Sequence, residues 1–107
     1  MRNLDVKGIK ELLRERIEKQ GRMEREGDLP DLQCAMVSLL YAVQALDKVH
    51  SSLAPAEFLR AYMGLLENRM SRLEAEDAGE YGSGRDSIGY IVHYAEDLLT
   101  QLSKRAA

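Results

Sequence analysis

Apolar residues recur along this chain at intervals of three and four, which is the spacing of one face of an α-helix. Four such segments are separated by short stretches rich in glycine, serine or acidic residues. They predict helices over residues 4–26, 29–50, 53–74 and 84–103. Since no segment alternates strictly between apolar and polar residues, as a half-buried strand would, the pattern indicates an all-α fold.

The second predicted helix contains the most apolar segment of the chain, and its apolar residues occupy two faces. The broader stripe is wide enough to pack against two neighbouring helices, so this helix is expected to be the central one. A second group lies on the opposite side and consists of Cys34, Val37, Tyr41 and Ala45. Either the first or the fourth helix covers this group, or a second protein chain does. We therefore predict that these four residues bind a partner.

The first helix has an apolar stripe that becomes thin in its second half, where Arg16, Gln20 and Glu24 interrupt it. Gly27 follows, in the position where a helix commonly ends on a left-handed residue. Because its stripe is thin, this helix has two possible packing partners. It packs either within its own bundle or against a second chain.

The outer face of the first helix is densely charged. Eight of the fifteen basic residues of the chain lie between residues 2 and 26, with six acidic residues interleaved among them. Many of these charges are four residues apart, which favours a solvated face that pairs with itself. The alternative is a nucleic-acid-associated accessory protein that uses Arg14, Arg22 and Arg25. The net charge of −3 argues against that alternative, since nucleic-acid binding needs unneutralised positive charge.

The predicted helices have similar lengths, about 33 Å each at 1.5 Å per residue. Matched lengths and short connections predict an antiparallel up-down four-helix bundle, as a single domain over residues 1–107. Asp28, Ser52 and Ser83 are expected to cap the helices that follow them. Gly64, inside the third helix, is expected to mark the close approach of another backbone.

Catalytic and metal-binding signatures are missing from the sequence. His50 and His93 are far apart and lack metal-ligand spacing, and the glycine-rich stretch 79–85 lacks the Gly-Lys-Ser/Thr ending of a P-loop. The only cysteine, Cys34, cannot form an intramolecular disulfide and is typical of a reducing, cytoplasmic setting. No stretch is apolar enough to serve as a signal peptide or to span a membrane. We predict no enzymatic activity, no cofactor and no metal.

A second candidate interaction surface lies on the outer face of the fourth helix. It carries Tyr90, His93, Tyr94 and Asp97, with little of the lysine and glutamate found on the first helix. Exposed aromatic residues are typical of protein interfaces. The sequence thus predicts a cytoplasmic protein–protein interaction module that binds a protein partner and itself, as a homodimer. It does not identify the partner.

Overall fold

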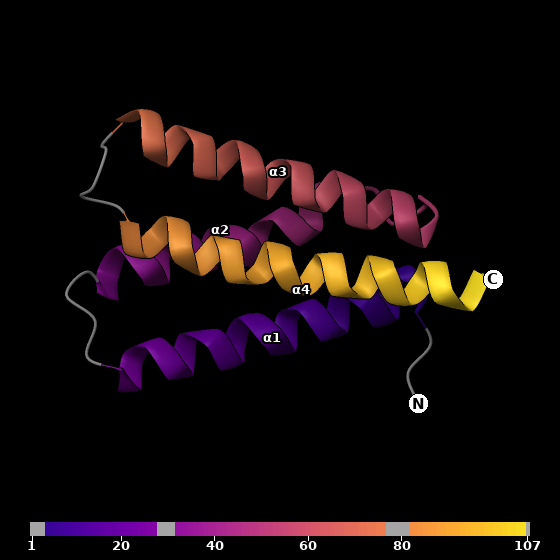
Figure 1. Cartoon of the computed structure of the whole chain (residues 1–107), viewed down its shortest axis with the longest axis horizontal. Coiled ribbons are helices and arrows are strands. Elements are labelled where there is room, and N and C mark those ends of the chain that lie inside the picture. The colour runs from indigo at the N-terminus through magenta and orange to yellow at the C-terminus, as the bar shows by residue number, and fades with distance from the viewer. Residues whose placement is uncertain (1–3, 28–31, 77–81, 107) are drawn as a thin grey trace.

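The computed structural model describes residues 4–27, 32–76 and 82–106 of the chain. These ranges contain four helices and no strand, which confirms the predicted all-α class. The helices are α1 (Val6–Glu26), α2 (Leu32–Lys48), α3 (Pro55–Glu76) and α4 (Gly82–Ala106). In the view of Figure 1, α4 lies between α1 and α3 and in front of α2.

Helix α1 begins and ends within two residues of its predicted bounds, but its end differs in geometry. Asp5 caps the start, where its Oδ1 accepts a hydrogen bond from the Gly8 N–H at 2.8 Å. At the other end Gly27 has a φ of −83°, so the expectation of a left-handed residue is wrong. The Gly27 N–H instead donates to the carbonyl of Met23 at 3.0 Å, which continues the helical pattern and leaves no need for a left-handed turn.

Helix α3 begins later than predicted, at Pro55. Proline has the backbone φ of a helix and lacks the N–H that would be unbonded in the first turn, so it suits this position. The Ala54 carbonyl accepts the N–H of Phe58 at 2.8 Å and so begins the helical bonding. Ser52 lies in the preceding turn, and its prediction as the N-cap is wrong.

Helix α4 begins earlier than predicted, at Gly82. Ser83 therefore lies inside the helix, and its prediction as the N-cap is wrong. Glycine and serine are weak helix formers, but tertiary contacts override such preferences, and Gly84 packs directly against α2. Asp28, predicted to cap the second helix, lies outside the described residues.

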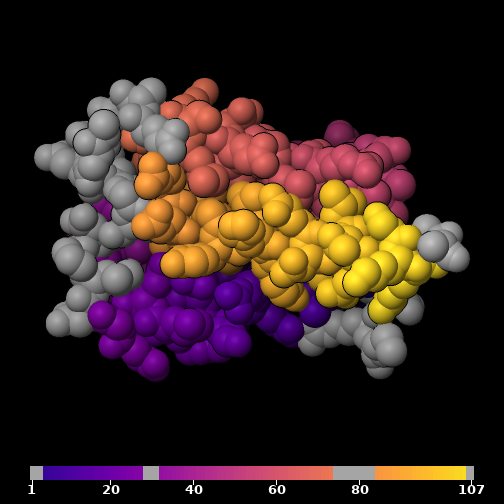
Figure 2. All heavy atoms as spheres, in the orientation of Figure 1, coloured from indigo at the N-terminus to yellow at the C-terminus, as the bar shows by residue number. Residues whose placement is uncertain are grey.

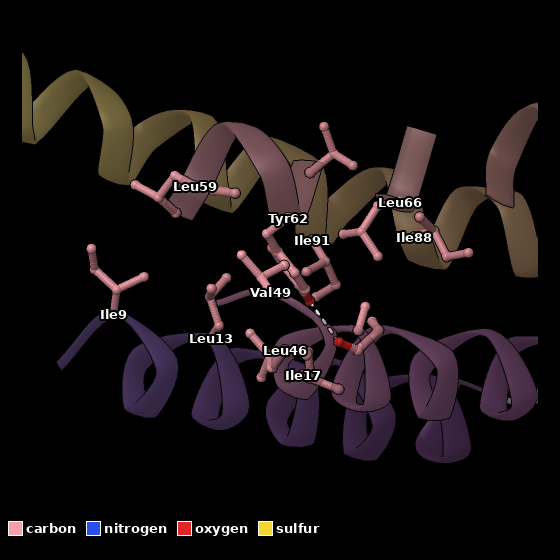
Figure 3. Packing of buried hydrophobic residues seen from close by; sticks show 14 of the residues in the cluster. Ile9, Leu13, Ile17, Leu46, Val49, Leu59, Tyr62, Leu66, Ile88 and Ile91 are labelled. Carbon is pink, nitrogen blue, oxygen red and sulfur yellow. Dashed lines mark hydrogen bonds between the residues drawn. The ribbon is translucent and has the colours of Figure 1, made fainter. Parts of the chain in front are cut away.

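A continuous apolar core is formed by side chains from all four helices (Figure 3). Its largest fully buried side chain is Tyr62 of α3, whose hydroxyl donates a hydrogen bond to the Ala42 carbonyl of α2 at 2.8 Å. Burial raises the pKa of the Tyr62 phenol above its ordinary value, so the hydroxyl keeps the proton that it donates. This bond satisfies the polar atom that a buried tyrosine brings into a core.

Helices α2 and α4 approach each other closely at Gly84. A Cβ atom at this position would lie 2.5 Å from Ser38 Oγ and 3.2 Å from the Cys34 carbonyl oxygen, so only glycine fits without a shift. At Gly64, by contrast, no atom lies within 4 Å of a Cβ, and the expectation of a close approach there is wrong. Helix α4 makes its most extensive contacts with α3 and α2, and it shares the central position predicted for the second helix alone.

Candidate functional site

The second apolar face of α2 is only partly covered by the chain itself. Ala45 is fully buried in the core. Tyr41 is half-buried, and its hydroxyl donates to the Leu65 carbonyl of α3 at 3.5 Å. The ammonium of Lys48 and the guanidinium of Arg69 lie 5.2 Å and 5.4 Å from the centre of its ring. The described contacts over Tyr41 thus come from α2 itself and from α3, and α3 was not among the alternatives of the first helix, the fourth helix or a second chain. Cover of the exposed part by a second chain stays a prediction.

Two large apolar side chains on α2 remain exposed. Val37 is 51% exposed and Leu40 is 56% exposed. They are three residues apart and so are neighbours on one helix face. We name this pair the α2 patch. Val37 was predicted from the sequence as a partner-binding residue and Leu40 was not, although the two residues are only three apart in the chain. The predicted residue Cys34, one turn earlier, is half-buried.

The predicted face of α4 is divided by the structure. Tyr90 is 52% exposed, and His93 and Asp97 are also exposed. Tyr94 is half-buried, and the guanidinium carbon of Arg16, from α1, lies 5.9 Å from the centre of its ring. Tyr94 therefore helps to hold α1 against α4, whereas the other three residues remain accessible.

A cleft of about 400 Å³ lies between α1 and α4, which run side by side on the face shown in Figure 2. We name it the α1–α4 cleft. It is lined by Arg16, Gln20, Met23, Glu24, Gly27, Asp86 and Tyr90. Three of these residues, at intervals of four along α1, are the same polar residues that interrupt its apolar stripe. The interruption of the stripe therefore marks one wall of a cleft.

Glu24 is the most buried charged residue of this cleft, at 7% exposure. Its Oε1 accepts hydrogen bonds from the hydroxyl of Ser87, on α4, and from Gln20 Nε2 at 3.4 Å. Its Oε2 is buried and has no hydrogen-bond partner among the described residues. Arg16 Nε is also buried and has no hydrogen-bond partner among the described residues. Glu24 thus has one oxygen that accepts two hydrogen bonds and a second, buried oxygen that accepts none from the described residues.

A second cleft, of about 290 Å³, lies on the other side of Tyr90, between α3 and α4. It is lined by Met70, Arg85, Asp86, Gly89, Tyr90 and His93. Tyr90 and Asp86 belong to both clefts, so the exposed tyrosine ring forms a wall between them. The sequence predicted Tyr90 and His93 as surface residues but gave no sign of this division.

The basic residues of α1 are partly engaged with α2. Arg14 forms an ion pair with Asp47 at 3.3 Å, and Lys10 Nζ donates to Ser51 Oγ at 2.8 Å. Arg22 and Arg25 are exposed. The ion pair reduces the positive charge that this helix presents to a nucleic acid.

Comparison of the chain with protein-family models, with curated proteins and with solved structures found no match. Within residues 4–27, 32–76 and 82–106, no three histidine, cysteine or acidic side chains gather as metal ligands. No helix in the described part of the chain combines the length and the apolarity needed to cross a membrane.

Proposed function

We propose that this chain is a non-enzymatic protein–protein interaction module that self-associates through the α2 patch. The observation that carries the proposal is the exposure of Val37 and Leu40, each more than half accessible, on the most apolar segment of the chain. Apolar side chains scattered singly over a surface need no explanation, but these two are adjacent. Association would remove both from water, which is favourable.

The proposed complex is a two-fold symmetric dimer in which α2 of one copy packs against α2 of the other. Such an interface places the same residues on both sides, so Leu40 approaches its own counterpart or a near neighbour. A stable interface buries about 800 Å² of each partner, more than two side chains supply. The exposed Gln33 and Gln44 would therefore form part of its polar rim.

The proposal extends to the architecture and setting of the module. The links of Arg14 to Asp47 and of Lys10 to Ser51 join the first half of α1 to the end of α2 and the turn after it, which supports an antiparallel up-down bundle. The single, half-buried cysteine supports a reducing, cytoplasmic setting. The accessible Tyr90 on α4 supports a second surface, for a different protein partner.

Self-association is tested by light scattering with the variant Leu40→Glu. The wild-type protein should have the mass of a dimer at high micromolar concentration. The variant should have the mass of a monomer, because symmetry brings two buried carboxylates close together. The matched control is Met23→Glu, since Met23 is 51% exposed but lies on α1 in the α1–α4 cleft. The control should remain dimeric, and a monomeric wild type would contradict the proposal.

A further inference from the structure

The α2 patch is bordered by positively charged side chains on its α3 side. Tyr41 follows Leu40 in the chain and lies one turn after Val37, so its ring adjoins the patch. The ammonium of Lys48 and the guanidinium of Arg69, from α3, lie 5.2 Å and 5.4 Å from the centre of that ring. Lys48 is exposed and Arg69 is half-buried, and neither forms an ion pair with a described acidic residue. This border therefore carries two cations without a carboxylate.

The α1 side of the patch is positively charged as well. A Cβ atom at Gly21 would lie 3.6 Å from a terminal nitrogen of Arg25 and 3.9 Å from the Met36 side chain, so this guanidinium lies beside α2. Met36 is one turn before Leu40 on the helix. Arg25 is exposed and forms no ion pair with a described acidic residue. The α2 patch thus lies between a cation on one side and two cations on the other.

Acidic residues do not neutralise these borders. Asp47 is the acidic residue of α2 and is already paired with Arg14. Lys10 adds a positive charge near the end of α2, where it donates to the neutral hydroxyl of Ser51. Glu18, one turn after Arg14, adds one negative charge. The positive charges placed around α2 by these contacts therefore exceed the negative ones, although the chain as a whole has a net charge of −3.

An apolar centre between two positively charged borders restricts what can pack on α2. A second copy presents the same positive borders, and like charges across an interface are unfavourable. An amphipathic helix with acidic residues on both sides of its apolar stripe presents opposite charges instead. A nucleic acid would contact the cations through its phosphates and leave the apolar centre without a matching surface. A bilayer would gain little from two half-exposed side chains, Val37 and Leu40.

We propose that the α2 patch and its two positively charged borders bind an acidic amphipathic helix of another protein, and that this helix displaces the second copy. Its apolar stripe covers Val37 and Leu40. Its acidic side chains pair with Arg25 on one border and with Lys48 and Arg69 on the other, where arginine can hold a carboxylate through two hydrogen bonds. The displacement rests on the proposed self-association, whereas the binding site does not.

The test uses a designed peptide of about 18 residues, about 27 Å long as a helix, which matches the 17 residues of α2. Leucines at intervals of three and four form its apolar stripe, and glutamates flank the stripe on both sides. Fluorescence anisotropy of the labelled peptide is measured as the full chain is added. A peptide with lysine in place of glutamate should bind at least about tenfold more weakly. A scrambled peptide of the same composition should bind as weakly, because it has no stripe.

The decisive variant is Arg25→Gln with Lys48→Gln, which removes one exposed cation from each border. Its affinity for the glutamate peptide should fall about tenfold, equivalent to about 1.4 kcal/mol. The matched control is Lys19→Gln with Arg22→Gln, an equal loss of charge at exposed positions of α1. The control should bind the glutamate peptide as the wild type does. Because all four side chains are exposed, both variants should keep the circular dichroism spectrum of the wild type.

Several outcomes would overturn the proposal. Absence of saturable binding, or equal affinity for the glutamate, lysine and scrambled peptides, would exclude an acidic helix as the occupant. Equal affinity in the wild type and in the decisive variant would place the peptide elsewhere. Tighter binding to anionic phospholipid vesicles or to duplex DNA, weakened by the same variant, would assign this face to a membrane or to a nucleic acid.

Light scattering with saturating glutamate peptide separates this proposal from self-association. A dimer that becomes a complex of one chain with one peptide supports the displacement. A dimer that binds the peptide and keeps its second copy contradicts the displacement. A wild type that is monomeric without peptide and binds the peptide would overturn self-association, and with it the displacement, while the site for an acidic helix would stand.

Discussion

The two halves of α1 use the same helical face for different purposes. In the first half that face carries Ile9 and Leu13, both fully buried, followed by Ile17 at 4% exposure. In the second half it carries Gln20 and Glu24, which are almost as buried but polar. The helix is regular throughout, so the difference lies in chemistry and not in geometry.

This difference separates the half of α1 that stabilises the folded protein from the half that contributes little to its stability. A buried aliphatic side chain contributes about 1.5–3 kcal/mol relative to an exposed one. A buried carboxyl group contributes nothing comparable and needs partners merely to be tolerated. The apolar half therefore holds the fold together, and the polar half forms the wall of a cleft.

The largest effect should follow from a change in the apolar half. Leu13→Ala should reduce the free energy of unfolding by about 2–5 kcal/mol, because it leaves a cavity in a fully buried site. Urea denaturation followed by circular dichroism measures this. Met23→Ala, in the other half, removes a side chain that is 51% exposed and should change stability by no more than about 0.5 kcal/mol. Equal effects would contradict the division of the helix.

An intermediate effect should follow from the contact between α2 and α4 at Gly84, three residues before Ser87. Gly84→Ala should destabilise the protein by about 1–3 kcal/mol, because the added methyl group meets Ser38 Oγ and the Cys34 carbonyl. Gly64→Ala is the matched control. It adds the same group where nothing lies within 4 Å and should stabilise the helix by about 0.5–1 kcal/mol. Thermal melting of both variants distinguishes a local steric conflict from a general effect of losing glycine.

The smallest effect should come from making the polar half apolar. The triple variant Gln20→Leu, Glu24→Leu and Ser87→Ala should lie within about 1 kcal/mol of the wild type in stability, or above it. It replaces every member of the buried hydrogen-bonded group by an apolar residue, and such a replacement is often neutral. A loss of stability as large as that of Leu13→Ala would show that Glu24 is part of the structural core.

The helices were predictable because their signal is local. Periodic apolar residues located all four, with ends that differ from the observed ones by a few residues. The caps were less predictable, since Ser52 and Ser83 have the right chemistry but lie in a turn and inside a helix. The close approach could not be located either, because Gly64 and Gly84 are both helical glycines. Only the packing of α4 on α2 distinguishes them.

The candidate site was visible in the sequence only as an irregularity. Arg16, Gln20 and Glu24 interrupted a stripe, but one helix does not reveal what faces the interruption. Ser87 gave no signal, since a serine near a helix start is ordinary, yet it is fully buried against Glu24. On α2 the exposed pair included Leu40, whose exposure depends on where the neighbouring helices lie. In each case the missing information was the position of a second helix.

Tyr90 has a further consequence because it belongs to both clefts of α4. An occupant that fixes its ring from one side also sets the shape of the other side. If both clefts bind ligands, this ring links the two affinities, and the linkage is reciprocal: each ligand changes the affinity for the other by the same factor.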